Sequence, residues 1–243
     1  MAPAPRSIAK TIDPKDRLIF AMDVPDSEAC KALVEQLGDQ VSFYKLGLEM
    51  FLSGDYFELV EWLQARDKKI FADLKLYDIP KTVERAVRQL SDRGVELLTV
   101  HAYRPVLEAA AIAKGDHLKV MGVTVLTSMS QENLTEIGID KSVEQLVLER
   151  AQQTLESGCD GVISSGLEAA KIREHVGKEL LIVSPGIRPA ENRPTDDQKR
   201  VVTVADAFNN GVDYIVVGRP IRDAANPAQA AAGIQETIAG IFS

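Results

Sequence analysis

The chain has 243 residues, with 28 lysines and arginines against 36 aspartates and glutamates, so its formal net charge is −8. This acidic balance with scattered basic residues excludes a general nucleic-acid-binding protein, and no apolar run approaches the roughly 20 residues that a membrane-spanning helix needs. The N-terminal stretch lacks the apolar core of a signal peptide, and the two cysteines form no CxxC pair, so a cytoplasmic protein without a disulfide framework or zinc site is expected.

Short apolar or β-branched runs alternate along the chain with longer segments whose apolar residues recur at helical spacing. After an N-terminal extension of residues 1–16, strands are predicted at residues 18–24, 42–47, 69–75, 97–102, 119–126, 161–164, 180–184 and 214–218. Helices are predicted between the strands, with one starting near Asp26 and Ser27 and a last one over residues 227–241.

Strands that alternate with helices in this way pair in parallel through right-handed crossovers. Eight such units predict a (β/α)8 barrel of the TIM type, formed by residues 17–243 as one α/β domain. A doubly wound open sheet is the main alternative. It usually has fewer strands and often a glycine-rich first turn, whereas the first turn here contains Pro25, Asp26 and Ser27.

Polar residues gather where the predicted strands end, while the strand interiors are apolar. In a parallel barrel the carboxyl ends of the strands form the mouth in which chemistry takes place. The polar residues at or just after these ends are Asp23, Lys45, Asp73, Lys75, His101, Thr127, Ser128, Ser164, Ser184 and Arg219. His101 has no other histidine or cysteine beside it in the sequence, so we expect it to form a hydrogen bond at the mouth and not to bind a metal.

The densest polar segment contains Asp73, Lys75 and Asp78. Asp73 and Lys75 are two residues apart on a strand, so both side chains are expected to face the barrel mouth. A salt bridge that closes a strand end is the structural alternative. Because Asp23 and Lys45 converge on the same mouth, and because burying such charges costs desolvation free energy, a reactive site is the better explanation.

A second group of residues predicts a phosphate site. The motifs are SPGIRP at residues 184–189 and GRP at residues 218–220, after predicted strands seven and eight. Loops at these positions commonly bind phosphate in such barrels. Gly186 and Gly218 allow a close backbone approach, and Arg188 and Arg219 supply fork-shaped donors. A simple turn is the alternative for SPGIRP alone. The polar loop of residues 190–199 is long enough to act as a lid.

Residues 73–83, DLKLYDIPKTV, resemble the signature of the orotidine 5′-monophosphate decarboxylase family, whose members catalyse the last step of UMP synthesis. Further matches are FAMD at 20–23, YKLG at 44–47, VLTS at 125–128, PGIR at 185–188 and VGRP at 217–220. The DxKxxDIPxT element is highly specific, whereas GRP alone is weak. The motifs that carry the resemblance leave residues 1–16 and 131–141 unassigned.

The resemblance implies a homodimeric enzyme that needs no metal or other cofactor. Lys75 would donate a proton to C6 of the pyrimidine within a charged network of Lys45, Asp73, Lys75 and Asp78. Asp78 and Thr82 would reach the site of the partner subunit. The implied substrate-binding residues are Asp23, Lys45, Asp73, Asp78, Ile79, Thr82, Thr127, Ser128, Arg188, Gln198, Gly218 and Arg219. Among them, Asp23 and Lys45 would contact the ribose, and Gln198 would bridge the base and the phosphate.

Two alternatives remain at this point. One is a sugar-phosphate enzyme of the same superfamily, such as a 3-keto-gulonate-phosphate decarboxylase or a hexulose-phosphate synthase. These enzymes also look like barrels with a DxKxxD pattern. Such enzymes use a metal and an acidic residue where Lys45 stands here, and this lysine argues against them. A non-catalytic phosphate-ligand sensor would be expected to have damaged catalytic positions, yet all four charged positions are intact.

Overall fold

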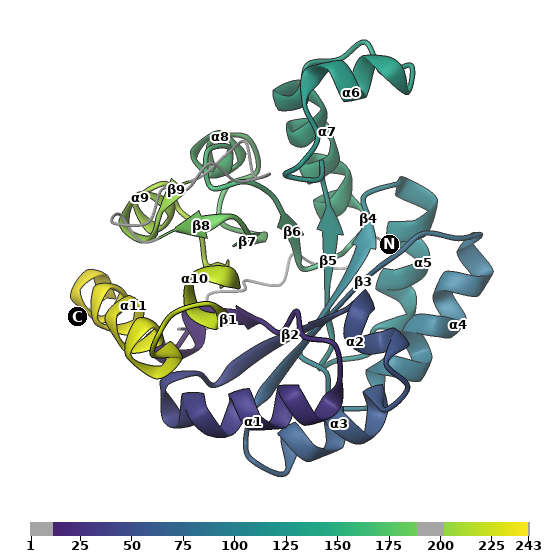
Figure 1. The fold of residues 1–243 in the computed structure, drawn as a ribbon. Helices are drawn as coiled ribbons and strands as arrows, with labels where there is room; N and C mark the ends of the chain where they lie inside the picture. The colour runs from purple at the N-terminus through teal and green to yellow at the C-terminus, as the bar shows by residue number, and fades with distance from the viewer. Residues whose placement is uncertain (1–11, 189–201, 243) are drawn as a thin grey trace.

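The computed structural model describes residues 12–188 and 202–242. Eight parallel strands close into a barrel in the order β1-β10-β7-β6-β5-β4-β3-β2, and helices surround it (Figure 1). The barrel strands are β1 Leu18–Ala21, β2 Phe43–Gly47, β3 Lys69–Leu76, β4 Leu97–His101, β5 Lys119–Val123, β6 Gly161–Ile163, β7 Leu181–Ser184 and β10 Tyr214–Val217. The closed order confirms the predicted (β/α)8 barrel and excludes the open sheet.

At least one helix lies between each pair of successive barrel strands, as predicted, and the starts of the helices have physical causes. They are α1 Ser27–Leu37, α2 Leu48–Leu52, α3 Tyr56–Gln64, α4 Pro80–Ser91, α5 Arg104–Ala113, α6 Gln131–Glu136, α7 Val143–Glu156, α8 Ala169–Val176, α9 Val204–Asn209, α10 Arg219–Arg222 and α11 Pro227–Phe242, with 3-10 turns η1 Pro14–Arg17 and η2 Gly38–Gln40. The Asp26 carboxylate caps α1 by accepting from the Ala29 N–H at 2.8 Å. Pro80 begins α4, where its fixed φ suits the first turn.

Alternate residues of each strand face opposite sides, which produces two apolar layers. The barrel interior is filled by side chains such as Ile19, Phe43, Phe71 and Met121. A larger cluster, to which Leu18 and the other intervening residues contribute, lies between the strands and the helices. The interior layer closes the barrel below its carboxyl-end mouth, so a ligand can enter only from that end.

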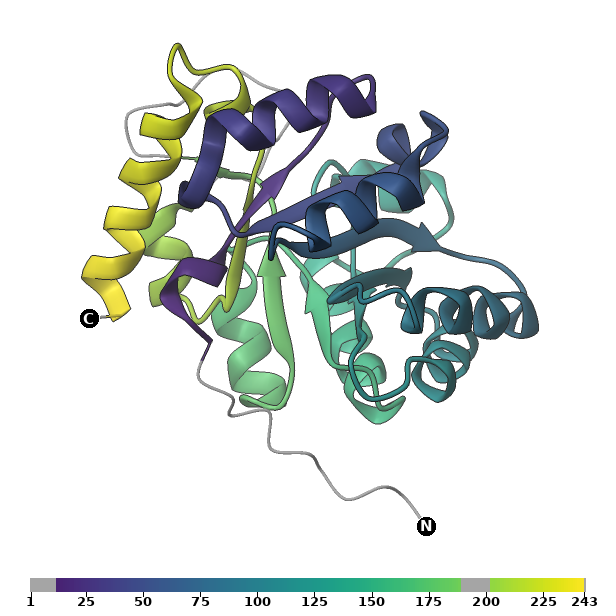
Figure 2. The same cartoon turned by 90° about the horizontal axis from the view of Figure 1, so that it is seen from below.

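The last helix completes the ring beside the first strand. It packs against η1, α1 and α9 (Figure 1 and Figure 2). Helix α6 projects beyond the ring of helices (Figure 1). Within residues 12–188 and 202–242, no helix is both long enough and apolar enough to cross a membrane.

Strand β3 contains an irregularity next to β4. Ala72 pairs with Leu98 and Leu76 pairs with Val100, so three β3 residues lie opposite Thr99 alone. Within this bulge Lys75 has a φ of 47°, a left-handed conformation that is unusual for a residue with a side chain. The bulge therefore changes the direction of the chain at the most polar part of the sequence.

Two predicted strands are about three residues too long at their carboxyl ends. Strand β1 ends at Ala21, so Asp23 lies in a loop and not on a strand, and β5 ends at Val123, so the loop that carries Thr127 begins earlier than predicted. The valines after these ends are buried although they belong to no strand, which explains why an apolar run overestimates strand length. A two-stranded parallel sheet, formed by β8 Ile187–Arg188 and β9 Val202–Thr203, was not predicted.

Both cysteines, Cys30 and Cys159, are buried free thiols. Burial raises the pKa of each thiol to about 12, so neither is ionised at neutral pH. They act as small apolar core residues, as the sequence predicts.

Candidate functional site

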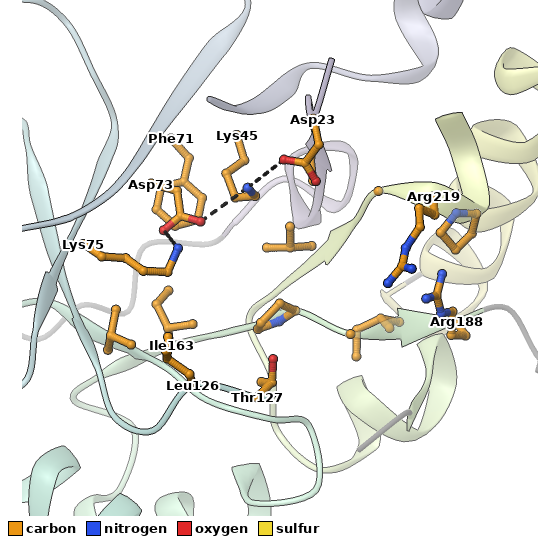
Figure 3. Close-up of a pocket in the computed structure, with 18 of the residues that line it drawn as sticks. Asp23, Lys45, Phe71, Asp73, Lys75, Leu126, Thr127, Ile163, Arg188 and Arg219 are labelled. Carbon is orange, nitrogen blue, oxygen red and sulfur yellow. Dashed lines mark hydrogen bonds and ion pairs between the residues drawn. The ribbon is translucent and has the colours of Figure 1, made fainter. Parts of the chain in front are cut away.

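A cavity of about 230 Å³ opens at the carboxyl end of the barrel. Its lining combines charged side chains from the strand ends with an apolar wall, which includes Phe71, Val123, Ile163 and Val216. Figure 3 shows Lys75 and Asp73 at one end of this cavity and Arg188 with Arg219 at the other. The two groups of polar residues predicted from the sequence therefore belong to one pocket.

Four charged side chains of alternating sign form a row at one end of the pocket. The Lys45 ammonium lies 3.5 Å from the Asp23 carboxylate and 3.3 Å from the Asp73 carboxylate (Figure 3). Lys75 completes the row through an ion pair of 2.8 Å with Asp73. We call these four residues the charged row. Strands β2 and β3 and the loop after β1 supply them, so closure of the barrel brings them together.

The carboxylate of Asp73 is the most enclosed member of the charged row, with 12% of its side chain exposed. Burial alone would raise its pKa. The charges of Lys45 and Lys75, with hydrogen bonds from Lys75 and Thr99, outweigh that effect and lower the pKa below its ordinary value. Unit charges about 4 Å apart interact by about 4 kcal/mol at an effective dielectric constant near 20, enough to hold Asp73 ionised.

The side chains of Asp73 and Lys75 both face the cavity, but the strand that carries them is irregular at Lys75. Leu74 between them packs among the residues that lie between strands and helices. Lys75 then takes its left-handed conformation in the bulge, and its N–H donates to Thr99 Oγ1 at 2.9 Å. The predicted orientation of the two side chains is confirmed, but the bulge contributes to it.

Two arginines and two glycines form the opposite end of the pocket. Arg188 on β8 is buried, and Arg219 begins α10. Gly186 has a φ of 77°, which favours glycine. A Cβ on Gly218 would lie 3.3 Å from Ala21 Cβ and 3.7 Å from Asp23 Oδ2, so a larger residue would crowd the lining. This end combines positive charge with close backbone approach, the combination that an oxyanion requires.

Other predicted site residues differ in where they lie. Thr127 lines the pocket, whereas Ser128 is exposed and does not line it. Gln198 and most of the predicted lid lie outside the described residues. The strand-end serines Ser164 and Ser184 are buried and do not line the pocket either.

Asp78, Ile79 and Thr82 do not join the pocket of their own chain. The Asp78 carboxylate accepts from the Ile79 N–H at 2.6 Å and is exposed, and the Ile79 side chain is 66% exposed. Tyr77 precedes them in the chain, and its ring centroid lies 6.0 Å from that of Tyr103. We call Tyr77, Ile79 and Tyr103 the exposed apolar patch.

His101 lines a separate cavity with Tyr77, Tyr103 and Arg150, and not the main pocket. Its ring lies edge-on to Tyr77, with centroids 5.3 Å apart. Burial lowers the pKa of His101, and the nearby charges of Arg150 and Lys75 lower it further. His101 is therefore held in its neutral form at neutral pH.

Sequence reasoning missed Thr99 and the apolar wall. Thr99 is fully buried in β4, and its hydroxyl donates to Asp73 Oδ1 at 2.9 Å. The available signal was a single polar residue at an inward-facing position of an apolar strand. Among the described residues, no three His, Cys, Asp or Glu side chains cluster closely enough to hold a metal ion.

Comparison with known proteins identifies close relatives. Residues 16–234 match the model of the "Orotidine 5'-phosphate decarboxylase / HUMPS family". An orotidine 5′-phosphate decarboxylase of Methylococcus capsulatus is 58% identical over 234 residues, which cover 96% of each chain. That of Xanthomonas euvesicatoria is 49% identical over 92% of each chain. A crystal structure of orotidine 5′-phosphate decarboxylase from Lactobacillus acidophilus superposes with a TM-score of 0.81 at 34% identity, covering 92% of this chain and 99% of that one.

Proposed function

The chain belongs to the orotidine 5′-phosphate decarboxylase / HUMPS family, and from that premise we infer that it decarboxylates orotidine 5′-monophosphate to UMP in pyrimidine biosynthesis. One observation carries the inference: a single pocket holds the charged row at one end and two arginines at the other. A nucleotide whose base loses a carboxylate and whose far end carries a phosphate matches that distribution of charge.

We propose that Lys75 acts as the proton donor. The bond between C6 and the carboxylate breaks, CO₂ leaves, and the bonding electron pair remains at C6. Lys75 then transfers a proton from its ammonium to C6, which yields UMP and a neutral amine. An ammonium placed in advance where negative charge develops lowers the barrier because it needs no reorganisation during the reaction.

Asp73 and Lys45 support this step in different ways. In the proposal the Asp73 carboxylate lies beside the departing carboxylate, and repulsion between the two favours loss of CO₂. Lys45, within 3.5 Å of Asp73 and Asp23, helps to keep Asp73 ionised and, with Asp23, contacts the ribose hydroxyls. Binding energy from the ribose and phosphate is thereby available to position the base.

The remaining binding residues follow the length of the substrate. Arg188, Gly218 and Arg219 are proposed to bind the phosphate, because their end of the pocket carries the fork-shaped donors that phosphate prefers. Thr127, which lines the pocket, is proposed to contact the pyrimidine. We also propose that Ser128 contacts the pyrimidine and that Gln198 bridges the pyrimidine and the phosphate.

A homodimer is the proposed assembly. Asp78, Ile79 and Thr82 are proposed to act in the pocket of the second copy, which accounts for their absence from the lining of the pocket in their own chain. The exposed apolar patch beside them supports such a contact, since isolated monomers rarely present several large apolar side chains together. In a two-fold dimer each copy would contribute the same residues to the other.

The sugar-phosphate alternative within the same family is less consistent with the pocket. Those enzymes resemble this chain in the DxKxxD pattern but use a metal with an acidic ligand where Lys45 stands. Here the ammonium of Lys45 already bridges Asp23 and Asp73, so a divalent cation at that position would face a positive charge. We further propose that residues 17–243 form one catalytic domain after an extension of residues 1–16, and that the protein is cytoplasmic.

Loss of the orotate absorbance after mixing protein with orotidine 5′-monophosphate tests the activity directly. We expect the absorbance to fall to completion at a rate proportional to protein concentration, in the presence or absence of EDTA. An unchanged absorbance would refute the decarboxylase function. Unchanged orotate absorbance, together with turnover of a sugar phosphate that EDTA abolishes and Mg²⁺ restores, would favour the sugar-phosphate alternative.

A further inference from the structure

We propose that Thr99 is a positioning residue, whose hydroxyl holds Asp73 and Lys75 in their reactive arrangement. The inference rests on the proposed function for the identity of the reaction, and on hydrogen bonds for the role of Thr99. Thr99 does not line the pocket, so it would act through its two neighbours and not on the substrate.

The Thr99 hydroxyl makes two hydrogen bonds of opposite polarity. It accepts from the Lys75 N–H at 2.9 Å and donates to Asp73 Oδ1 at 2.9 Å. A hydroxyl has one proton to donate, and here that proton is directed at the carboxylate. The side chain is fully buried, so water cannot replace either contact without rearrangement.

The contact with Lys75 compensates for the bulge. Between the pairs Ala72–Leu98 and Leu76–Val100, Thr99 is the only β4 residue opposite three residues of β3. At this point the Lys75 N–H is satisfied by the Thr99 side chain, while the backbone adopts a φ of 47°. The hydroxyl thus stabilises a backbone conformation that residues other than glycine rarely adopt.

The contact with Asp73 fixes the rotation of its carboxylate. Oδ1 accepts from both the Thr99 hydroxyl and the Lys75 ammonium, whereas Oδ2 faces the Lys45 ammonium at 3.3 Å. The two ammonium groups lie on flexible side chains, but Thr99 is attached to a rigid barrel strand. Thr99 is therefore the one of these three partners that ties the carboxylate to the scaffold.

The titratable groups around Asp73 come from several elements, and Thr99 is the neutral member of the set. The charged or titratable side chains that act on Asp73 or its partners are Lys45 on β2, Lys75 on β3, Tyr56 on α3, Asp23 after β1 and His101 on β4. Removing the Thr99 hydroxyl leaves all of these charges in place. Its effect on the ionisation of Asp73 can therefore be measured separately from theirs.

The test compares Thr99→Val, which preserves shape, with Thr99→Ser, which preserves the hydroxyl. Loss of a hydrogen bond to a charged group predicts a fall in kcat of about tenfold or more in Thr99→Val, with little change in KM. The acid limb of the pH–rate profile should move to higher pH, because Asp73 loses a contact that favours its ionised form. Thr99→Ser should restore most of kcat and the original acid limb.

Thr154→Val is the matched control. Thr154 is fully buried, and its hydroxyl donates to the Arg150 carbonyl within α7, away from the pocket. This variant should retain the wild-type kcat and acid limb. A Thr99→Val enzyme with wild-type kcat and acid limb would overturn the proposal. So would a Thr99→Ser enzyme as impaired as Thr99→Val, because the methyl group and not the hydroxyl would then matter.

A second measurement needs no substrate and separates this inference from the proposed function. Asp73 has a lowered pKa in the folded state, so it contributes stability that is present above its unfolded pKa and lost as the pH falls through its folded pKa. In Thr99→Val this acid-dependent loss of unfolding free energy should be smaller than in the wild type. If the unfolding free energy depended on pH in the same way in both proteins, the role of Thr99 would be refuted. This conclusion would hold even if the enzyme acted on a different substrate.

Discussion

The ammonium of Lys75 lies 2.8 Å from the carboxylate of Asp73, and Leu74 between them packs on the opposite side of the strand. The pair is therefore formed by the protein before any ligand binds. Lys45 holds the other oxygen of the same carboxylate, so Lys75 can release its contact to Asp73 without leaving that carboxylate uncompensated.

Replacing Lys75 by alanine should reduce turnover of orotidine 5′-monophosphate by at least about a thousandfold, because both the proton donor and the local positive charge are lost. Binding of UMP, measured by calorimetry, should remain detectable because the arginine end is unchanged. Lys69→Ala is the control, since Lys69 begins the same strand and pairs with Asp16 outside the pocket. Near-normal turnover of Lys75→Ala would exclude it as the donor.

Replacing Arg219 by alanine should lower kcat/KM for the phosphorylated substrate by about ten- to a hundredfold, the effect of losing charge-assisted hydrogen bonds. The same change should scarcely affect the slow decarboxylation of the nucleoside that lacks the phosphate. Parallel assays of both substrates with wild-type and variant protein measure the difference. Equal losses on the two substrates would show that Arg219 does not bind the phosphate.

Mixing two inactive variants tests the exchange of residues across a dimer. In a dimer of Lys75→Ala with Asp78→Ala, one of the two pockets combines an intact Lys75 with an intact Asp78 from the other chain. Random association of equal amounts should therefore restore about a quarter of wild-type activity. The activity is measured after the variants are unfolded and refolded together, with each variant refolded alone as a control. No restoration would place Asp78 in the pocket of its own chain.

His101 should make the fold less stable as the pH falls. Its folded pKa is below the ordinary value of 6.5, so below that pH the unfolded chain takes up more protons than the folded one. The unfolding free energy should therefore decrease from about pH 6.5 downwards until the folded pKa is reached. Chemical unfolding at several pH values should show a shallower decrease for His101→Gln than for the wild type. The exposed His117 provides the control, His117→Gln, which should follow the wild type.

Two glycine substitutions should have opposite effects on stability. A Cβ on Gly161 would lie 2.4 Å from Met121 Cε and 2.5 Å from the Leu181 carbonyl oxygen, which the barrel holds in place. Gly161→Ala should therefore destabilise the fold by about 1–3 kcal/mol. Gly233 lies exposed in α11 with open space around its Cβ position, so Gly233→Ala should stabilise by up to about 1 kcal/mol. Thermal unfolding of the two variants compares them, and a stable Gly161→Ala would contradict the tight packing at that position.

The sequence predicts the barrel well because its physical causes are local. Apolar runs at strand spacing and a capping residue such as Asp26 depend only on near neighbours. The convergence of Asp23, Lys45 and Asp73 also follows from the rule that strand ends share one mouth of a parallel barrel. The wrong ends of β1 and β5 arise because loop valines pack as strand valines do.

The features that the sequence did not predict depend on distant partners. In the bulge, the Lys75 N–H donates to the hydroxyl of Thr99, which lies 24 positions away on another strand. Strands β8 and β9 consist of two residues each and exist only because Ile187 and Arg188 pair with Val202 and Thr203. A local pattern can mark Thr99 as a polar residue on an apolar strand, but it cannot identify the distant partner that such a residue contacts.

The unequal exposure of the two lysines in the charged row has a consequence for the proton balance of the reaction. A carboxylate that leaves as neutral CO₂ and is replaced by a hydrogen atom consumes one proton per turnover, and in the proposed reaction Lys75 supplies it. The Lys75 side chain is 32% exposed, whereas that of Lys45 is 13% exposed. Lys75 is therefore the lysine of the charged row that can recover a proton directly from solvent between turnovers, as a proton donor must.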